Sequence, residues 1–144
     1  VVICALGVRI GQAPGTTRSA GTRAIVDAMH DAGVQRLVCV STVGVGDSMG
    51  RLSWPARLLL PRIIGPQRLA EASAQETVLA ASRLDWSVLR PTALKDSSNA
   101  DGYRIGTGLR TSLRSQLSRA HLAEALLAEA VEPRFVRQAA TVTE

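Results

Sequence analysis

Apolar residues along this chain follow two different periods. Short continuous apolar runs, rich in Val, Leu and Ile, stop at small polar residues or at Pro, and such runs predict strands buried on both faces. Longer stretches repeat apolar residues every three or four positions, which predicts amphipathic helices. The predicted strands are residues 1–6, 36–41, 85–89 and 135–143, and the predicted helices are residues 19–32, 66–83 and 118–131. This alternation predicts an α/β protein with a parallel sheet, right-handed crossovers and flanking helices.

Residues that start or stop helices stand at the ends of these stretches. Gly33 and Pro133 follow the first and last predicted helices and are suited to end them. Pro66 suits a first helical turn, and Ser118 is a favourable N-cap. Residues 55–64 show no clear period, so helix and loop both stay open for that segment.

A glycine-rich segment follows the second predicted strand. Gly44, Gly46 and Gly50 are not spaced like the Gly-x-Gly-x-x-Gly turn that holds a pyrophosphate against a helix N-terminus. Asp47 would also bring a negative charge close to the phosphates. We therefore expect residues 42–53 to form a flexible loop, and we expect this chain to lack a phosphate cradle.

The composition fits one domain. The chain has 144 residues, of which 46% are hydrophobic and 3% aromatic, so residues 1–144 can form a single, mainly aliphatic core. The 17 basic residues are scattered, and the few aromatic residues that could stack on bases lie far apart. The sequence therefore predicts a solvated basic surface and no nucleic-acid partner.

Neither a membrane segment nor a metal site is predicted. The most apolar stretch, residues 58–64, is short and interrupted, and no secretory leader opens the chain, which favours a cytoplasmic protein without a membrane partner. Cys4 and Cys39 lie in strand-like runs and fit two buried thiols in a reducing compartment. His30 and His121 are the two histidines, which are too few and too distant to complete a metal site.

Polar residues at the ends of two predicted strands are the first candidates for a functional site. Residues 41–42 (Ser-Thr) end the second strand, and residues 90–92 (Arg-Pro-Thr) follow the third. In open α/β sheets, ligands bind just beyond the carboxyl ends of such strands. Glu71 and Glu76, by contrast, are spaced as solvated surface groups and predict no carboxylate pair for acid–base chemistry.

Three segments together carry a resemblance to a known family. Residues 21–34, 36–43 and 84–91 resemble the atypical short-chain dehydrogenase/reductases with NAD(P)-binding Rossmann domains, and more narrowly their NmrA-like and biliverdin-reductase-B (flavin reductase) branch. The resemblance implies NAD or NADP as cofactor. It also implies that the chain begins at the family's fourth strand, so that residues 1–144 are the C-terminal portion of a Rossmann-like doubly wound parallel sheet without its glycine-loop segment. We expect such a truncated chain to have little or no activity alone.

The resemblance also implies which residues line the cofactor. Beside the first strand of this chain these are Leu6, Gly7, Val8 and Arg9. Under the nicotinamide ribose they are Ser41, Thr42 and Val43. Near the nicotinamide amide they are Arg90, Pro91, Thr92, Ala93 and Leu94.

Catalytic residues are harder to assign. The Tyr-x-x-x-Lys pair of classical members is missing, because Tyr103 has no Lys four residues on and Ala72 stands where the helix would carry a Lys. Ser41 and Thr42 remain the candidates for orienting a substrate carbonyl. Hydride transfer to a flavin-like or quinone-like acceptor needs mostly orientation, with the proton supplied by solvent, and it therefore tolerates this absence.

Two functions stay open on the sequence. The first is an NAD(P)H-dependent oxidoreductase that passes hydride to a small-molecule acceptor of the flavin, quinone or carbonyl type. The second is an NmrA-type regulator that binds the dinucleotide without turnover, and the missing Tyr–Lys pair favours this alternative. The sequence predicts no particular oligomeric state.

Overall fold

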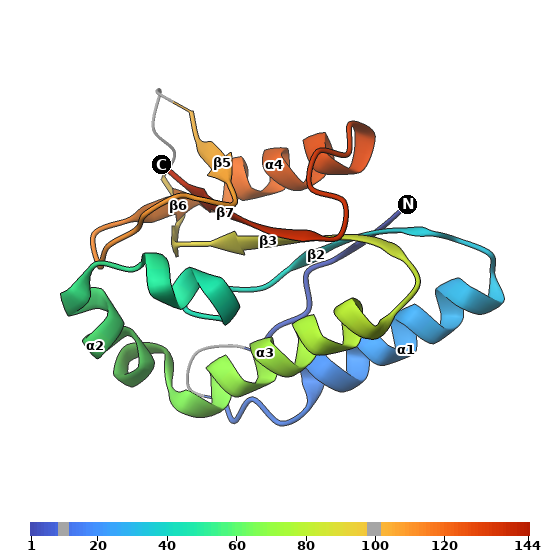
Figure 1. Cartoon of the computed structure of the whole chain (residues 1–144), viewed down its shortest axis with the longest axis horizontal. Coiled ribbons are helices and arrows are strands. Elements are labelled where there is room, and N and C mark those ends of the chain that lie inside the picture. Colours follow the sequence, from blue (N-terminus) through green and yellow to red (C-terminus); the bar gives the residue numbers. More distant parts are fainter. Residues whose placement is uncertain (9–11, 98–101) are drawn as a thin grey trace.

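The computed structural model describes residues 1–8, 12–97 and 102–144, which form a sheet with helices on both faces (Figure 1). The sheet has five strands in the order β1-β2-β3-β7-β5. They span Val2–Cys4 (β1), Arg36–Val40 (β2), Asp85–Pro91 (β3), Arg104–Gly106 (β5) and Gln138–Thr143 (β7). Strands β1, β2, β3 and β7 run parallel to one another, and β5 runs antiparallel to β7. The prediction of an α/β fold with a mainly parallel sheet is confirmed.

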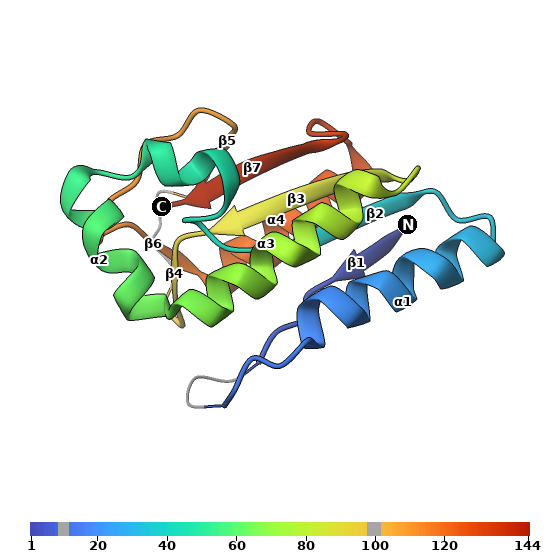
Figure 2. The ribbon, with the colours of Figure 1, turned by 60° about the horizontal axis from the view of Figure 1, so that its bottom comes forward.

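Two helices cover one face of the sheet and a third covers the other. Helices α1 (Thr17–Asp31) and α3 (Pro66–Ala81) lie side by side, and α4 (Arg119–Val131) lies on the opposite face (Figures 1 and 2). The core under α1 and α3 consists of Cys4, Val26, Met29, Leu37, Cys39, Leu79, Leu84 and Val88. The core under α4 consists of Val38, Val40, Leu89, Leu117, Leu122, Ala125, Leu126, Ala140 and Val142. Successive strand residues serve opposite cores, which is why these strands read as continuous apolar runs.

A buried carboxylate fastens α4 to the sheet. Glu129 is fully buried, and its Oε1 accepts hydrogen bonds from Arg36 Nη2 at 2.9 Å and from Ser87 Oγ at 2.8 Å. The backbone N–H groups of Arg134 and Phe135 donate to the same carboxylate, each at 2.9–3.1 Å. These donors offset the cost of burying a carboxylate, which amounts to several kcal/mol when the charge has no partner.

Four smaller elements gather at the carboxyl ends of the parallel strands. The 3₁₀ helix η1 (Gly46–Arg51) and helix α2 (Trp54–Ile64) connect β2 to α3. Two short strands, β4 (Ala93–Lys95) and β6 (Gln116–Ser118), pair in parallel as a separate sheet. Figures 1 and 2 show these elements at the end of the molecule toward which β3 points. They form the surroundings of any ligand bound beyond the strand ends.

All four predicted strands differ at their ends from the sequence prediction. β1 spans Val2–Cys4 and not residues 1–6, and β2 ends at Val40 and not at residue 41. β3 was expected to end at Leu89 but continues to Pro91, because proline loses only its N–H and its carbonyl oxygen still accepts from the backbone N–H of Val43 at 3.3 Å. β7 was expected from residue 135 but begins at Gln138, because Arg137 has a φ of 56°, a left-handed conformation that interrupts an extended strand.

The prediction of a flexible loop over residues 42–53 is wrong. This segment contains η1, and the buried Ser48 accepts a hydrogen bond at its Oγ from the backbone N–H of Gly44 at 3.0 Å. The undecided segment 55–64 is helical, as part of α2, with Pro55 in the first turn. β4 and β6 were not predicted, because three-residue strands are too short to show a period.

The helix boundary signals acted as predicted. Ser118 caps α4, since its Oγ accepts from the backbone N–H of His121 at 3.0 Å. Gly33 follows the end of α1 with a φ of 67°, which a side chain would strain. Within the ranges that the structure describes, no helix is long and apolar enough to cross a membrane.

Candidate functional site

A cavity of about 130 Å³ opens at the carboxyl ends of β1 and β2. The chain after each of these strands, the approach to α1 and the turn from α2 into α3 enclose it. Its lining residues are Val8, Pro14, Arg18, Thr42, Ile64, Arg68 and Glu71. Two residues named from the sequence, Val8 and Thr42, are therefore brought together here although 34 positions separate them.

Arg18 is held in place by a buried polar network beneath the cavity. Its Nη1 donates to Oε1 of Gln75 at 3.4 Å, and the Gln75 side chain is fully buried. Nε2 of Gln75 donates to Oγ1 of Thr22 and to Sγ of Cys39, both at 3.1 Å. Burial lowers the pKa of Arg18 from its usual value, because the protein removes water from the cation. A charge in the cavity would therefore shift the pKa of Arg18 strongly. An anion would raise this pKa, and another cation would lower it further.

A second guanidinium reaches the cavity from the start of α3. Arg68 donates to the backbone carbonyl oxygens of Val8 at 3.4 Å and Gln12 at 2.9 Å, so it also positions the chain after β1. Glu71 is engaged by Ser19, whose hydroxyl lies 3.0 and 3.1 Å from its two carboxylate oxygens. The lining thus carries two cations against one carboxylate that is already hydrogen-bonded, a balance that favours an anionic ligand group.

The hydroxyl of Ser41 is buried without a hydrogen-bond partner in the described part of the chain. Ser41 is 2% exposed at the end of β2, and its backbone N–H donates to the carbonyl of Leu89 at 2.9 Å. Buried polar atoms are almost always paired, so this orphaned hydroxyl is a candidate ligand contact, but Ser41 is not among the residues that line the cavity. Thr42, the next residue, lines the cavity itself.

Arg90, by contrast, is committed to an ion-pair cluster. Its Nε and Nη2 donate to the two carboxylate oxygens of Glu76 at 2.9 and 2.6 Å, and its Nη1 donates to Asp47 at 2.6 Å. Burial opposes the charge of Arg90, but the bonds to Glu76 and Asp47 outweigh burial and raise its pKa. The expectation that Glu76 is a solvated surface group is wrong, because its side chain is only 15% exposed. Arg90 therefore joins β3 to α3 and η1.

The close approach of this cluster explains one glycine of the 42–53 segment. Gly46 has a φ of 56°, and a Cβ added there would lie 2.8 Å from Nη2 of Arg90. A side chain at position 46 would thus be strained in its backbone and would collide with the guanidinium. Gly46 therefore serves the packing of Arg90.

Of the residues named from the sequence after β1, Gly7 and Val8 lie near Arg18, whereas the Leu6 side chain lies against Gly21 of α1. Leu6 and Gly7 follow β1, and a Cβ at Gly7 would be 3.6 Å from Nη2 of Arg18. Arg9, named with them, lies outside the described residues.

The residues named at and after the end of β3, together with Val43, which was named after β2, are distributed over two environments. Pro91 and Val43 are buried and hydrogen-bonded to each other through the backbone, and the buried Thr92 has its Oγ1 3.3 Å from the hydroxyl of Thr143. Ala93 and Leu94 are exposed in β4. The structure therefore separates these residues from the cavity lining, which contains none of them.

Sequence reasoning missed Arg18, Arg68 and Gln75. A signal was available for Gln75, which occurs at helical spacing between the buried Ala72 and Leu79 and therefore had to lie in the apolar stripe. Arg18 and Arg68 carried no such signal. Both lie near the start of a helix in a chain whose many other arginines are mostly surface groups.

Two thiols lie together under the same network. Cys4 and Cys39 are partners in the register of β1 and β2, and both are free and buried. A hydrogen bond between the thiols lowers the pKa of Cys4 to about 6, whereas this bond and burial raise the pKa of Cys39.

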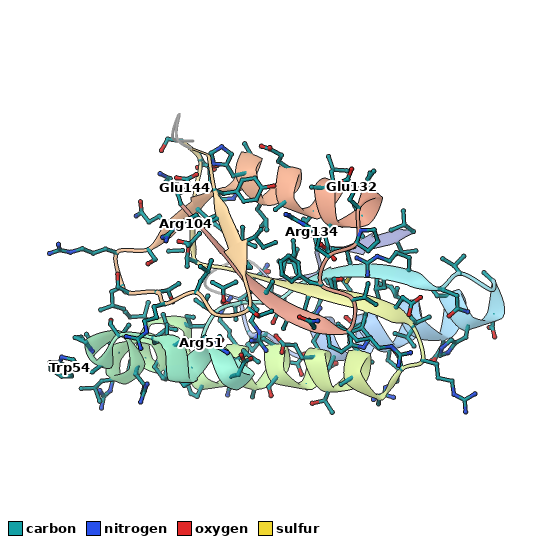
Figure 3. The ribbon with its side chains drawn as sticks, turned by 45° about the horizontal axis from the view of Figure 1, so that its top comes forward. Arg51, Trp54, Arg104, Glu132, Arg134 and Glu144 are labelled. Atoms are coloured by element: carbon teal, nitrogen blue, oxygen red, sulfur yellow. The ribbon has the colours of Figure 1, made fainter. Side chains whose placement is uncertain are left out.

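His121 belongs to a separate cluster at the start of α4. Its Nδ1 lies 2.7 Å from Oε1 of Glu144, and its ring lies 5.7 Å from that of Tyr103. Figure 3 places Glu144 beside β6 and β7, away from α1 and α3. In the described ranges, no group of three or more His, Cys, Asp or Glu side chains could hold a metal ion.

The fold and the cavity define the class of protein. A mainly parallel sheet flanked by helices, with a cationic cavity beyond the carboxyl ends of its strands, is the arrangement of Rossmann-like nucleotide-binding domains. Residues 1–133 match the family described as NAD(P)H-binding. The chain belongs to this family, and its cofactor is NAD or NADP. The predicted atypical short-chain dehydrogenase/reductase domain is confirmed.

Several solved structures share the fold. ChuY, an anaerobilin reductase from Escherichia coli O157:H7, is 25% identical, with a TM-score of 0.75 over 98% of this chain and 62% of ChuY. A putative exported protein from Burkholderia pseudomallei is 27% identical, with a TM-score of 0.73 over 99% of this chain and 71% of that protein. A short-chain dehydrogenase/reductase from Veillonella parvula, solved with NADP, is 18% identical with a TM-score of 0.77, over 99% of this chain and 62% of that one, and shows the fold alone.

One curated relative is an uncharacterized chloroplastic protein of Arabidopsis thaliana. It is 35% identical over an alignment of 99 residues, and the alignment covers 66% of this chain and 35% of the relative. The chain thus spans about a third of this relative's length and 62% of the length of ChuY from strain O157:H7.

Proposed function

We propose that the protein is an NAD(P)H-dependent oxidoreductase that passes hydride to a flavin-, quinone- or carbonyl-type acceptor. Membership of the NAD(P)H-binding family and the likeness to ChuY, a reductase, support this proposal. The single observation that carries it is the cavity beyond β1 and β2, which Thr42 and the guanidiniums of Arg18 and Arg68 line together.

The residues present fit one part of a nicotinamide dinucleotide. The cavity of about 130 Å³ is smaller than the roughly 300–1,000 Å³ of pockets that enclose whole ligands. Arg18 and Arg68 suit a phosphate, and Ser41 and Thr42 suit the hydroxyl or amide groups of a ribose or nicotinamide. The bound cofactor would supply the hydride, while these side chains hold and orient it.

The chain's own groups are weak proton donors. Thr42 and Ser41 carry alcohol hydroxyls, and Glu71 is hydrogen-bonded to Ser19. Tyr103 lies next to His121 and does not line the cavity, and burial raises its pKa, which disfavours it as an acid–base group. Acceptors whose reduction depends on orientation, with protons from solvent, therefore fit this site better than simple ketones do.

The glycine loop that binds the pyrophosphate is proposed to lie in a segment outside residues 1–144. The chain spans about 62% of ChuY, and one edge of β1 pairs with β2 while no strand pairs with the other edge in the described ranges. A strand carrying the glycine loop would extend the sheet at that edge. On this proposal, the activity belongs to the longer protein.

Turnover with defined acceptors tests the proposal. The full-length protein is mixed with NADPH or NADH and with riboflavin, menadione or a simple ketone, and loss of absorbance at the nicotinamide band is followed. We expect oxidation of one cofactor with riboflavin or menadione and little with the ketone. No oxidation with any of them, despite cofactor binding, would refute the oxidoreductase function.

A second function is favoured by one specific observation. Ala72 is fully buried where a catalytic Lys would be expected, and the cavity lining contains no Tyr. A regulator of the NmrA type, which binds the dinucleotide without turnover, would need neither residue. Titration with oxidised and reduced cofactor distinguishes the two functions, because a sensor binds one redox form preferentially and leaves it unchanged.

A further inference from the structure

Two free thiols meet on neighbouring strands, and we call them the dithiol site. Cys4 of β1 and Cys39 of β2 are register partners in a parallel pair, and both belong to the core under α1 and α3, so both side chains lie on the same face of the sheet. Neighbouring strands lie about 4.8 Å apart, and disulfides join residues whose Cα atoms are about 4.4–6.8 Å apart. The backbone therefore holds the two cysteines at a separation that a disulfide can span.

Shared polar contacts hold the two sulfur atoms together. Oγ1 of Thr22 lies 3.9 Å from Sγ of Cys4 and accepts from Nε2 of Gln75 at 3.1 Å. The same nitrogen of Gln75 donates to Sγ of Cys39 at 3.1 Å. Both Thr22 and Gln75 are fully buried. Thiols that only fill space in a core need no such partners, so these contacts indicate a further role for the dithiol site.

The two thiols differ in acidity. The hydrogen bond with Cys39 lowers the pKa of Cys4 to about 6 against the opposing effect of burial, and the Arg18 guanidinium also lowers this pKa. The hydrogen bond with Cys4, together with burial, raises the pKa of Cys39. Because the thiolate is the reactive form of cysteine, Cys4 is suited to attack an oxidant while Cys39 keeps its proton.

Gln75 connects the dithiol site to the cavity beyond β1 and β2. Its Oε1 accepts from Nη1 of Arg18 at 3.4 Å, and Arg18 lines the cavity. Joining the sulfur atoms would draw the sulfur of Cys39 toward Cys4 and weaken the bond that Gln75 donates to it. Because Gln75 is fully buried, its amide cannot turn to water, so a shift of this side chain would displace Arg18.

We propose that Cys4 and Cys39 form a reversible disulfide when the protein meets a peroxide, and that this disulfide weakens anion binding in the cavity by displacing Arg18. Formation of the disulfide does not depend on the function proposed above. The effect on the cavity rests on that function, because the anion is then a phosphate of the cofactor.

The oxidation consumes one peroxide and releases two waters. The thiolate of Cys4 attacks one peroxide oxygen, the O–O bond breaks, and the leaving hydroxide takes up the proton that Cys4 released. The sulfur of Cys39 then attacks the sulfenic acid on Cys4, the S–O bond breaks, and the proton of Cys39 leaves with the hydroxyl as the second water. Two electrons pass from the thiols to the peroxide, and a dithiol reductant returns them by thiol–disulfide exchange.

Peptide mapping of the full-length protein tests the disulfide. The protein is treated with hydrogen peroxide, its free thiols are blocked in denaturant, and it is digested with trypsin without reduction. We expect residues 37–51 to be linked to the peptide that ends at Arg9, with two hydrogen atoms fewer than the separate peptides, and dithiothreitol should release both. Recovery of the two peptides unlinked and blocked, or of Cys39 linked to a different cysteine or to a second copy, would overturn the proposal.

Single variants identify the attacking thiol. In Cys39→Ser, the sulfenic acid on Cys4 has no thiol to meet, so dimedone should label Cys4 after peroxide treatment. In Cys4→Ser, the protonated Cys39 should remain unlabelled. Label on Cys39 in place of Cys4 would contradict the role of Cys4. Melting temperatures of both variants are compared with that of the parent, and the mapping of the parent protein does not depend on them.

Cofactor titration tests the effect on the cavity. The full-length protein is titrated with NADPH and NADH in its reduced and its oxidised form, and we expect the oxidised form to bind the preferred cofactor at least about fivefold more weakly until dithiothreitol is added. The double variant Cys4→Ser/Cys39→Ser, treated with peroxide in the same way, is the control for oxidation elsewhere and should change by less than about twofold. Equal affinity of the reduced form and the mapped disulfide form would overturn the effect. A reduced protein that binds neither cofactor would overturn the proposed function together with this effect, whereas the mapping would still show whether the disulfide forms.

Discussion

Arg90 of β3 and Glu76 of α3 form a two-point ion pair, with Nε to Oε1 at 2.9 Å and Nη2 to Oε2 at 2.6 Å. The Arg90 side chain is only 5% exposed, and its remaining terminal nitrogen bonds Asp47 of η1 at 2.6 Å. A residue that the sequence suggested for cofactor contact thus fixes the elements around the site.

Replacing Glu76 should therefore destabilise the fold. Glu76→Gln keeps the shape but leaves the buried Arg90 with one carboxylate, and we expect a loss of about 1–3 kcal/mol in the free energy of unfolding. Urea titration followed by circular dichroism measures it. Glu124→Gln, at an exposed position of α4, is the control and should change stability by less than about 0.5 kcal/mol. Equal effects of the two substitutions would contradict the role given to the pair.

Removing the Ser41 hydroxyl should not destabilise the fold, in contrast to removing the Glu76 carboxylate. The hydroxyl is buried without a partner, and such a group costs about 1–3 kcal/mol, so Ser41→Ala should leave the unfolding free energy unchanged or raise it. Ser87→Ala is the comparison, because Ser87 Oγ donates to Glu129 at 2.8 Å and its loss should destabilise the protein. In the full-length protein, Ser41→Ala should also weaken cofactor binding. A clear loss of stability in Ser41→Ala would show that the hydroxyl has a structural partner.

Stability should fall in acid in a way that depends on Glu144. The ion pair with Lys95 at 2.6 Å, helped by the N–H of Ser118 and by His121, lowers the pKa of Glu144 from 4.5 to about 2. A carboxylate whose pKa is lower in the folded than in the unfolded protein contributes its full stabilisation at a pH above its pKa in the unfolded chain. This stabilisation is lost as the pH falls from about 5 toward 2. Unfolding free energies measured across this range should fall less steeply in Glu144→Gln than in the parent protein. Equal slopes would contradict the pairing.

The cavity alone should be a poor dinucleotide site. It encloses about 130 Å³, and its lining among the described residues offers two cationic side chains and no glycine, so residues 1–144 expressed alone should not bind NADPH or NADH at micromolar concentration. Fluorescence of the reduced nicotinamide reports binding. Micromolar affinity of this chain alone would show that the proposed preceding segment is not needed.

The main strands and helices could be predicted because their burial follows the period of the backbone. Leu37 and Cys39 serve one core and Val38 and Val40 the other, so β2 reads as a continuous apolar run. The site at the strand ends could be predicted only in part from such patterns. Thr42 lies in the cavity, whereas Arg90 lies in an ion-pair cluster.

The roles of the arginines around the site could not be predicted, because they depend on contacts between positions far apart in the sequence. Arg90 takes its partners from 14 and 43 positions away, and no local pattern distinguishes a buried arginine with two carboxylates from a ligand-binding one. Arg18 acquires its role through Gln75, which is 57 positions away. Long-range pairing of this kind becomes visible only when the helices are packed on the sheet.

The central claim is that the cofactor occupies the cavity beyond β1 and β2. The most direct test fills this cavity by substitution in the full-length protein and measures the affinity for the cofactor. Thr42→Phe places a ring in the cavity beyond β1 and β2, and Thr107→Phe places the same ring at an exposed turn as the control. Both variants are titrated with NADPH and NADH after their melting temperatures are compared with that of the parent. We predict that Thr42→Phe weakens binding of the preferred cofactor at least about tenfold and that Thr107→Phe leaves it unchanged. Unaltered affinity in a folded Thr42→Phe variant would show that the cofactor does not occupy this cavity.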